Sequence, residues 1–473
     1  MTAVSAPFNY LVVSDLHLRG GYADHTAGLY HFDEEFADFL RYYRLHRAAI
    51  RPWQLIISGD FIEFLYVTDA PDPNEPLLRG ATFTPSEYRY GAGTEAPKAR
   101  WKLDRILRTS HLQLLLALAR FVAEGNSVVI LRGNHDAEMF WPEVQTHFLR
   151  LLAEHHPADV GYMAMKEAVA QRVQFAPWFW YVPELLYVEH GCQHDPFCAF
   201  EYFLYPVVPT RPTRIENSIS DLSVRYFANQ IKLLDAMATE NIKSISQYLG
   251  WVVRGNLRIV PRAARLYGGM VRGVLSKSGR PDPAAERAVR EEHDRRLVAA
   301  DGALGLAPGT TAKVHAMHAR PIMRSWLAAA RFLGLDLFAA VVLLLATAVL
   351  IIVKYPGQIA WLGVLAMVAV LGGVIYGGAL RFTQISAYAQ LRGIGERLAE
   401  MFDVANVVFG HSHKAGSSPM RNGGTYFNVG TWVPLAKQSF FVYFALDGAE
   451  RQGRLWRWNR ERQEPDPFEG KRL

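Results

Sequence analysis

Cysteine is scarce in this sequence: Cys192 and Cys198 are the two among 473 residues. Such a pair cannot build a disulfide framework, so we expect two packed thiols in a reducing compartment. The first apolar run leads directly into a polar motif, so we expect no signal peptide. Charged residues are only 20% of the chain, yet half of all residues are hydrophobic and 12% are aromatic, which excludes a disordered protein. The length predicts about two to three domains.

Five short, mostly apolar runs each end in polar side chains. Runs without polar alternation are typical of strands covered on both faces, and the five lie at 10–13, 54–57, 128–131, 184–189 and 406–409. The polar residues that follow them are Asp15 and His17; Asp60 and Glu63; Asn134, His135 and Asp136; His190, His194 and Asp195; and His411 and His413. Because open α/β sheets bind ligands beyond the carboxyl ends of their strands, the sequence predicts one shared site.

Carboxylates, an amide and imidazoles are ligands of divalent transition metals. Seven of the residues fit this role: Asp15, His17, Asp60, Asn134, His190, His411 and His413. An aspartate is the natural bridge, since its two oxygens can hold two ions about 3.5–4 Å apart. A single Asp-x-His, or one polar turn after a strand, is common without any metal. The recurrence at five strand ends is what favours a dinuclear site.

The blocks and their order resemble the calcineurin-like metallophosphoesterase superfamily. Its pattern is Asp-x-His, Gly-Asp-x-x-Asp/Glu, Gly-Asn-His-Asp/Glu, a lone His and Gly-His-x-His, and the matching stretches begin at Asp15, Gly59, Gly133, His190 and Gly410. The resemblance covers residues 8–200 and 400–447. It implies an α/β fold, a four-layer αββα sandwich with an inserted helical region, and hydrolysis of phosphoric esters with two divalent metal ions. Manganese is expected, with iron or zinc as alternatives.

The resemblance also implies a role for each residue. Asp15, His17 and His413 would hold one metal ion, and Asn134, His190 and His411 would hold the other. Asp60 would bridge the two ions. Two cations would lower the pKa of a water between them enough to yield hydroxide near neutral pH. His135 would donate a proton to the leaving oxygen or contact the phosphate, and Asp136 would orient its imidazole.

The remaining polar residues receive lesser roles. Glu63 is expected to hydrogen-bond a ligand histidine rather than to contact a metal directly. His194 and Asp195 follow a ligand histidine closely, so they are candidates for substrate contact or for support of that ligand. His315 and His318 lie in another part of the chain, and no carboxylate stands beside them in the sequence. We therefore interpret these two histidines as structural.

Two long apolar runs occupy residues 335–353 and 359–380. Each has about 20 residues, the length of a helix that crosses a bilayer. The Pro356-Gly357 pair between them is a turn signal, so we predict a two-helix transmembrane hairpin. Two buried helices of a soluble protein are the alternative, but soluble helices of this length normally have a polar face.

The predicted metal ligands lie on both sides of the hairpin, so the chain must cross the membrane an even number of times. Arginines flank both ends of the hairpin and only Lys354 lies in the outer turn, which places the catalytic domain on the cytoplasmic side of the inner membrane.

Gly373 and Gly377 permit close helix packing, within the hairpin or between protomers of a homo-oligomer. The predicted division is 1–205 and 382–473 for the phosphoesterase domain, 206–330 for a helical, basic, membrane-proximal insertion and 331–381 for the hairpin.

Residues 251–280 hold seven basic side chains and no acidic one. Apolar residues lie between them at helical spacing, which is typical of a helix on an anionic membrane surface. A nucleic-acid-binding patch has the same charge signature, but the hairpin downstream favours the membrane. A solvated helix face packed on the catalytic domain is a third interpretation.

These features predict a membrane-anchored phosphoesterase that cleaves a phosphate ester or pyrophosphate, with a lipid head group as the expected substrate. One alternative is a phosphodiesterase or nuclease acting on a soluble nucleotide or nucleic acid. Another is a regulatory protein without catalysis, which the full ligand set and His135 argue against. Enzymes that cleave UDP-diacylglucosamine in lipid A synthesis share the Asp-x-His opening, but their third block usually has arginine where this chain has His135.

Overall fold

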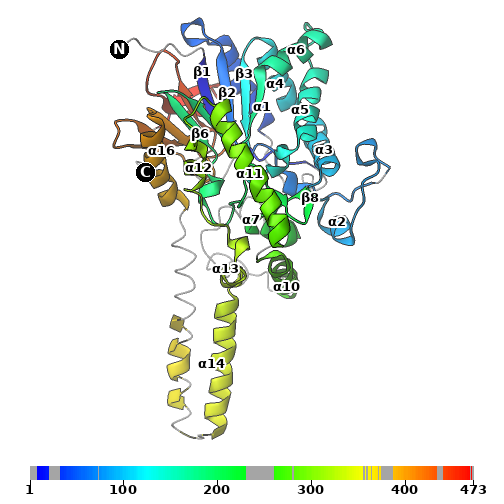
Figure 1. Cartoon of the computed structure of the whole chain (residues 1–473), viewed down its shortest axis with the longest axis vertical. Coiled ribbons are helices and arrows are strands. Elements are labelled where there is room, and N and C mark those ends of the chain that lie inside the picture. Colours follow the sequence, from blue (N-terminus) through cyan, green and yellow to red (C-terminus); the bar gives the residue numbers. More distant parts are fainter. Residues whose placement is uncertain are drawn as a thin grey trace. The chain divides into compact units, whose positions relative to one another are not determined.

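The computed structural model describes residues 8–20, 32–72, 74–230, 260–279, 282–354, 357, 361–363, 365–370, 372–373, 387–433, 440–468 and 470. The chain divides into two compact units (Figure 1). The first comprises Met1–Asp221, Pro281–Arg320 and Ala387–Leu473, and the second comprises Leu222–Arg280 and Pro321–Ser386. The expected insertion at 206–330 therefore contributes residues to both units.

The larger sheet of the first unit has seven strands in the order β14-β13-β12-β1-β2-β3-β4. The strands are β1 (Asn9–Val13), β2 (Trp53–Ser58), β3 (Ser127–Leu131), β4 (Val173–Ala176), β12 (Val442–Leu446), β13 (Arg454–Asn459) and β14 (Glu464–Pro467). β1 to β4 are parallel to one another, whereas β12 to β14 extend the sheet in antiparallel fashion. The strands predicted at 10–13, 54–57 and 128–131 are confirmed as β1, β2 and β3.

The smaller sheet has five strands in the order β10-β11-β9-β6-β5. They are β5 (Phe179–Val182), β6 (Leu186–Glu189), β9 (Asn406–Phe409), β10 (Gly416–Pro419) and β11 (Thr425–Asn428). The central three, β6, β9 and β11, run parallel, and the two edge strands are antiparallel to their neighbours. A separate hairpin consists of β7 (Val207–Val208) and β8 (Arg211–Ile215).

The helices of the first unit connect and cover these strands. They are α1 (Asp33–Leu45), α2 (Pro85–Tyr90), α3 (Ala96–Asp104), α4 (Leu112–Ala123), α5 (Pro142–Glu154), α6 (Tyr162–Arg172), α11 (Pro283–Ala303), α12 (Thr310–His315) and α16 (Ala387–Phe402), while α7 (Ile219–Tyr226) begins in this unit. Short 3₁₀ turns follow several strands, among them Phe64–Tyr66, Ala137–Phe140 and Cys192–His194.

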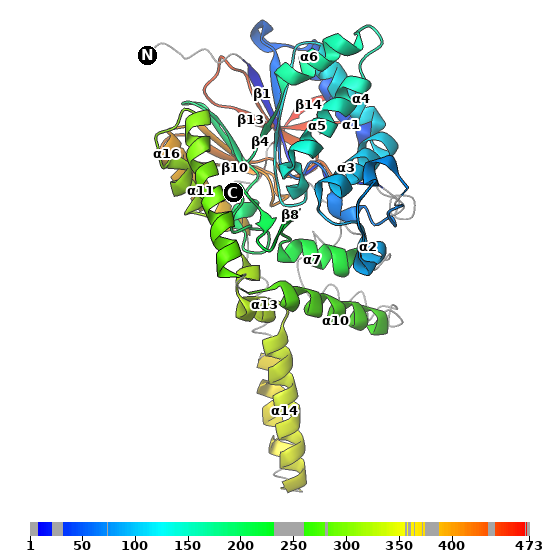
Figure 2. The same cartoon turned by 45° about the vertical axis from the view of Figure 1, so that its right-hand side comes forward.

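The two sheets share a hydrophobic core. Tyr10 and Val12 of β1 belong to one buried cluster with Val188 of β6 and Val408 of β9. Because side chains alternate along a strand, the intervening residues of β1 join a second cluster with α1, α4 and α5. A third cluster joins the other face of the smaller sheet to α11, α12 and α16. Figure 2 shows α11 and α16 on one side of the sheets and α1, α3 and α5 on the other. The predicted α/β class is confirmed.

The strongly apolar run Trp101–Ala123 predicts a single helix, and this prediction is wrong in one respect. The segment contains two helices, α3 and α4, which are bent by 94° with respect to each other, with a π-helical turn at Arg105–Ser110 before the bend. The bend lies at His111, whose ring nitrogens are 2.7 Å from Asp33 Oδ1 and 2.7 Å from the Arg19 carbonyl oxygen. These tertiary contacts fix a break that the apolar pattern alone does not indicate.

Five prolines and several glycines in residues 68–100 predict an exposed loop, and this prediction is also wrong. Helix α2 and the first turn of α3 lie there, and Glu87 forms a buried ion pair with Lys98. Prolines led to the error, because proline reads as a loop signal but is also favoured in the first turn of a helix. Both α2 and α3 begin with proline in their first turn, and Thr84 caps α2 in a capping box with Glu87.

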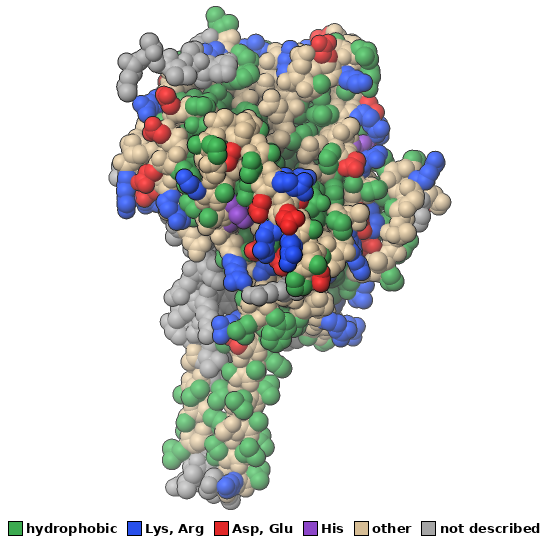
Figure 3. Space-filling model, in the orientation of Figure 1, with side chains coloured by type: hydrophobic (Ala, Val, Ile, Leu, Met, Phe, Trp, Pro, Cys, Tyr) green, Lys and Arg blue, Asp and Glu red, His purple; other side chains and the backbone are tan. Residues whose placement is uncertain are grey.

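The second unit contains α10 (Val260–Lys277), α13 (Trp326–Phe332) and α14 (Leu335–Lys354). Helix α14 coincides with the first predicted membrane helix, has 20 residues and buries none of them. Among the described residues it is the one helix long and apolar enough to cross a membrane, unless the bent pair α3–α4 is counted as a single span. Hydrophobic side chains are spread over the visible surface of α14 (Figure 3).

The second predicted membrane helix, 359–380, lies in large part outside the described residues. Its described stretches 361–363, 365–370 and 372–373 are helical. Gly363 lies close to α14, since a Cβ placed on it would come 3.0 Å from Ile351 Cγ2. A Cβ on Gly373 would meet no atom within 4 Å, and Gly377 lies outside the described residues. The close glycine contact in the described part of the hairpin is therefore at Gly363, not at the predicted Gly373.

Helix α10 covers most of the predicted basic segment. Its apolar row Leu266, Met270 and Val274 is buried, whereas Arg262, Arg265 and Arg272 are exposed. The Tyr267 hydroxyl donates a hydrogen bond to the Leu333 carbonyl after α13. Because the apolar row is already buried, the face of α10 that is open to a partner is the basic one. The remainder of the predicted segment, 251–259, lies outside the described residues.

Candidate metal centre

Five strand ends supply the site. β1, β2 and β3 of the larger sheet and β6 and β9 of the smaller sheet each end at one group of the predicted polar residues. Backbone hydrogen bonds join these ends: the His17 amide donates to the Asp60 carbonyl (2.8 Å), and the Gly410 amide donates to the His190 carbonyl (3.1 Å). The two sheets are joined by the His411 amide, which donates to Asp15 Oδ2 at 3.0 Å. The predicted convergence of the blocks is therefore present.

Five of the predicted ligands have left-handed backbone conformations. The angle φ is 56° at Asp15, 45° at His17, 49° at Asp60, 63° at His411 and 53° at His413. These residues are half of the non-glycine positions with positive φ in the described part of the chain. Such conformations cost on the order of 1 kcal/mol or more each and gather where function requires them. Their concentration at these strand ends supports a functional site.

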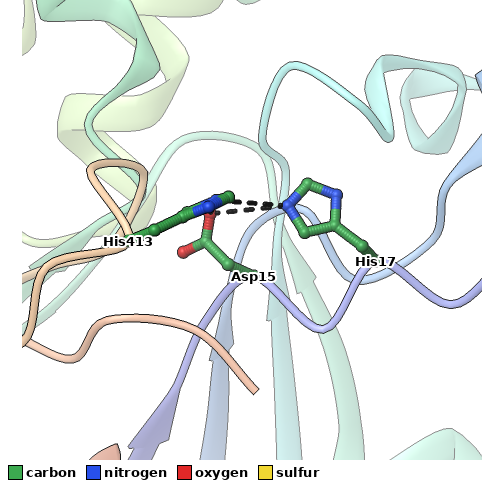
Figure 4. A group of neighbouring side chains, drawn as sticks. All are labelled: Asp15, His17 and His413. Carbon is green, nitrogen blue, oxygen red and sulfur yellow. Dashed lines mark hydrogen bonds and ion pairs between the residues drawn. The ribbon is translucent and has the colours of Figure 1, made fainter. Parts of the chain in front are cut away.

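Asp15, His17 and His413 face one another (Figure 4). Nε2 of His413 lies 2.9 Å from Oδ1 of Asp15 and 3.3 Å from Nε2 of His17. Nε2 of His17 lies 3.8 Å from the same Asp15 oxygen. Ligand atoms bound to one metal at about 2.0–2.2 Å are separated by about 3.0–3.5 Å. These three side chains therefore have the spacing of ligands around a single cation.

Asp60 lies between the two groups of histidines. Its Oδ2 is 3.1 Å from Nε2 of His190 and 3.9 Å from Nε2 of His17. Its Oδ1 accepts a hydrogen bond of 2.9 Å from the His135 amide. The sequence argument assigned one carboxylate oxygen to each metal, whereas the structure directs the single oxygen Oδ2 toward histidines of both groups. The carboxylate is positioned to bridge through one oxygen.

His190 and His411 form the second half of the site with Asp60, and their ligand atoms lie within 4.8 Å of one another. Nδ1 of His190 donates to the Ser58 carbonyl at 2.8 Å, which leaves Nε2 as the nitrogen with a lone pair. Nε2 of His411 lies 3.1 Å from Oδ2 of Asp195, which leaves Nδ1. Asp195 is thus in contact with a predicted ligand, one of the two roles expected for it.

Asn134 Oδ1 and His190 Nε2 are among the buried polar atoms of the site that make no aligned hydrogen bond with the described residues. Both residues are almost completely buried. Leaving a buried acceptor unpaired costs about 1–3 kcal/mol, and a metal ion that accepts these lone pairs removes that cost. The residues present therefore fit divalent cations, with oxygen and nitrogen donors of the kind that transition metals prefer.

Two glycines allow the strand ends to approach so closely. A Cβ at Gly133 would overlap the Asp60 carboxylate and lie 2.6 Å from its amide nitrogen. Gly59 has φ of +80°, and a Cβ there would come 2.6 Å from Cγ of His190. Any larger residue at either position would displace the central carboxylate or its histidine neighbour.

Glu63 connects two histidines of the site. Its Oε2 lies 2.9 Å from Nδ1 of His17 and 2.8 Å from Nδ1 of His135. The structure therefore places Glu63 where the sequence argument expected it, hydrogen-bonded to a histidine. By holding Nδ1 of His17, the carboxylate leaves Nε2 of that ring for a metal.

Asp136 has a different role from the expected one. Its two oxygens accept hydrogen bonds from the Gly133 amide (2.6 Å) and the Phe61 amide (2.8 Å). The carboxylate thus folds back on its own turn and ties it to the segment after β2. The acidic group beside the His135 imidazole is Glu63 instead, which is 72 positions earlier in the sequence.

Opposite charges dominate the electrostatics of the site. Burial by itself would raise the pKa of Asp60, but His190 and His135 lower it far below its usual range. Burial would lower the pKa of both histidines, yet Asp60 and Glu63 raise that of His135 to about 10, and Asp60 and Asp15 raise that of His190 to about 9. The carboxylates of the site thus stabilise the positive charge of the neighbouring histidines. The same negative charge would attract metal cations to the centre.

His194 does not join this centre. Its Nε2 lies 3.2 Å from Oε1 of Glu189, and these two side chains form a separate group with His318. The sequence argument treated His318 as structural because no carboxylate is near it in the chain, but the fold brings Glu189 beside it. The one sequence signal was Glu189 itself, a charged residue at the end of an otherwise apolar strand.

No known family model matches this chain, and no curated protein matches it. The metal assignment therefore depends on the residues and their geometry.

Proposed function

We propose that this protein is a dinuclear-metal phosphoesterase of the calcineurin-like metallophosphoesterase superfamily, with its two sheets as the inner layers of an αββα sandwich. The observation that supports it most is the position of Asp60 Oδ2 between Nε2 of His17 and Nε2 of His190. Asp15 and His413 complete one side, and Asn134 and His411 complete the other. Manganese is the proposed metal, with iron or zinc as alternatives.

Two bound divalent ions would supply a water with a lowered pKa as the nucleophile and would neutralise charge on the phosphate oxygens. The chain's own residues fix the geometry. Glu63 holds Nδ1 of His17 and the Ser58 carbonyl holds Nδ1 of His190, so both Nε2 atoms are presented to the centre. Rings fixed in this way need little reorganisation when a cation binds.

His135 is the proposed general acid. Its Nδ1 lies 2.8 Å from Glu63 Oε2, and its pKa is raised by Glu63 and Asp60 against the effect of burial, to about 10. The ring is therefore protonated at neutral pH, and the proton on Nε2 is the one available to a leaving oxygen. Protonation of the leaving group by such a side chain typically contributes about 100-fold or more to the rate.

We also propose that α14 anchors the enzyme in the cytoplasmic membrane. Asp15 precedes α14 and His413 follows it, yet they are 2.9 Å apart. A chain that crosses a bilayer at α14 must therefore cross back before α16, and 359–380 is the apolar run between them. The arginines at both ends of this pair of runs favour a cytoplasmic location of the site by the positive-inside rule.

The proposed substrate is a phosphate ester or pyrophosphate in a lipid head group, because an anchor of this kind confines the site to the membrane surface. The exposed arginines Arg262, Arg265 and Arg272 of α10 fit this location. Each basic side chain near an anionic bilayer contributes on the order of 1 kcal/mol of attraction.

The test compares Asp60→Asn with wild type and with Asp159→Asn, whose carboxylate is 65% exposed and pairs with Arg120 on the surface. Full-length protein in detergent micelles is assayed with an aryl phosphate and an aryl phosphodiester in the presence of Mn²⁺, and bound metal is counted by mass spectrometry. We expect wild type and Asp159→Asn to be active with at least two ions per chain, and Asp60→Asn to lose both ions and activity. Less than one ion per wild-type chain, or an active Asp60→Asn, would refute the proposal.

A further inference from the structure

Glu189, His194 and His318 form a second group of potential metal ligands, which shares no residue with the centre at Asp60. One ligand atom of each lies within 4.8 Å of the others. Glu189 is the last residue of β6 and is followed by His190 of the first centre. Because successive side chains of a strand point to opposite faces, the two groups lie on opposite sides of β6.

The atoms of this group are arranged as ligands rather than as hydrogen-bond partners. Nε2 of His194 lies 3.2 Å from Oε1 of Glu189, but it makes no aligned hydrogen bond, and neither does Nε2 of His318. The His194 side chain is only 1% exposed. Ligand atoms of one ion point toward a shared point and not at each other, and they lie about 3.0–3.5 Å apart. The His194–Glu189 pair has this spacing, and the ligand atom of His318 lies within 4.8 Å of both.

Neighbouring side chains hold Glu189 and His318 in position. Oε2 of Glu189 accepts a hydrogen bond from the Tyr187 hydroxyl (2.7 Å), and Oε1 accepts one from Trp178 Nε1 (3.2 Å). Nδ1 of His318 faces Nδ1 of His315 at 3.3 Å, which leaves Nε2 of His318 for the group. Partners of this kind orient metal-binding side chains and keep the carboxylate ionised.

We propose that Glu189, His194 and His318 bind a third divalent ion, with zinc as the fitting metal. Two imidazoles and one carboxylate with a water in the fourth position form a tetrahedral set that zinc prefers. The ion would fasten the segment Pro281–Arg320, which carries His318, to β6 of the smaller sheet. The Ala319 amide already donates to the Gln193 carbonyl at 2.8 Å, so the segment contacts the turn Cys192–His194 that follows β6. This role is independent of the phosphoesterase activity.

The experiment counts zinc in full-length protein that has been stripped with a chelator, reloaded with Zn²⁺ and desalted. We expect Asp60→Asn to retain about one ion per chain and the double variant Asp60→Asn/His318→Ala to retain none. The matched control is Asp60→Asn/His293→Ala, because His293 is a buried histidine of the same segment that belongs to no ligand group. It should retain the ion. Equal zinc content in the His318→Ala and His293→Ala proteins would overturn the proposal.

A second set of measurements needs no substitution of the proposed zinc ligands. Crystals of zinc-loaded wild type, measured at the zinc absorption edge, should show an anomalous peak among Glu189, His194 and His318. Removal of zinc should also lower the unfolding temperature of Asp60→Asn, in which the first centre is already disabled. The absence of that peak at full loading would overturn the assignment even if His318→Ala failed to fold.

Discussion

Nε2 of His413 lies 2.9 Å from Oδ1 of Asp15, although 398 residues separate the two in the sequence. The contact is possible because β6 and β9 pair directly, with Glu189 opposite Phe409. The inserted part of the chain lies between β6 and β9 in the sequence. The two strands that precede His190 and His411 therefore remain paired neighbours. A large insertion between paired strands therefore leaves the centre intact.

Because Gly133 lies directly against Asp60, adding a single methyl group at Gly133 should strongly reduce activity and metal binding. Gly133→Ala would push the Asp60 carboxylate out of place, because its Cβ would overlap the carboxylate. We expect activity to fall by about 100-fold or more and bound metal to decrease. Gly161→Ala is the control, since a Cβ there meets no atom within 4 Å. Metal counting and circular dichroism would separate a lost site from lost folding, and a fully loaded, active Gly133→Ala would contradict the geometry.

A substitution of His135 distinguishes proton donation from metal binding. His135→Asn should lower kcat by about 100-fold or more, the scale of one general acid, while both ions at the first centre remain. His46→Asn, at an exposed histidine on the surface, should change neither quantity. Loss of an ion together with activity would instead make His135 a ligand, a role that its position within 4.8 Å of His17 and Asp60 permits geometrically.

The strand ends of the site could be predicted from the sequence because buried strands lack polar alternation. β9 was predicted at 406–409, as observed. Polar residues that directly follow such a run must lie at the carboxyl end of the strand. Strands β13 and β14 escaped the same reasoning, because they alternate polar and apolar residues and β14 contains two prolines. Their place beside β12 is fixed by pairing across the sheet and not by local pattern.

The partners of individual side chains were less predictable. Proximity in sequence suggested Asp136 as the support of His135, but Asp136 accepts two backbone amides of its own turn and Glu63 takes that place. His318 was set aside for the same reason, since its carboxylate neighbour Glu189 lies on a distant strand. Residue type predicts which groups bind metals, but tertiary packing determines which of them meet.

The raised pKa values of His190 and His135 predict opposite pH dependence for the metal-free and metal-loaded proteins. Their folded-state pKa values are about 9 and 10, above the value of about 6.5 in an unfolded chain. A raised folded pKa adds stability that is complete below about pH 6.5 and is lost as the pH rises through the folded value. Stability of the metal-free protein should therefore fall between pH 6.5 and 10.

Metal binding reverses the slope, because a ligating histidine must be neutral. Thermal unfolding between pH 6 and 9, with chelator or with Mn²⁺, should give a Tm that falls by about 5 °C or more without metal and rises with it. Glu63, Asp15 and Asp60 do not contribute to this trend, since the pKa of Glu63 is about 2 and those of Asp15 and Asp60 lie well below their usual range. Burial raises the pKa of Asp136 to about 7, so this group adds to the loss of stability only up to about that pH. Parallel curves would show that His190 does not bind a metal.

The proposed transmembrane hairpin predicts a labelling pattern. A cysteine in place of Gly357 should react with a membrane-impermeant maleimide added from outside the cell, whereas tags at both termini should be accessible only after the membrane is broken. The native cysteines give little background, since Cys192 and Cys198 are buried and burial raises the pKa of both thiols. Labelling of Gly357→Cys and of a terminus from the same side would contradict the two crossings.

The proposed membrane anchor predicts a preference for lipid-linked substrates. A phosphoester or pyrophosphate in a lipid head group, presented in mixed micelles, should be cleaved with a kcat/KM about tenfold or more above that of its deacylated form. A tenfold ratio corresponds to about 1.4 kcal/mol, which one or two basic side chains at an anionic surface can supply. Arg265→Glu on the exposed face of α10 should reduce this ratio and leave the rate on the soluble substrate unchanged.

The matched control for the charge reversal is Arg287→Glu, at an exposed position of α11 in the first unit. If attraction of α10 to anionic lipid produces the preference, Arg287→Glu should keep the wild-type ratio while Arg265→Glu loses it. Added salt should lower the ratio in wild type, because screening weakens surface attraction. Equal rates on the lipid and its deacylated form would mean that the membrane part only localises the enzyme, since the acyl chains would then contribute nothing to binding at the metal centre.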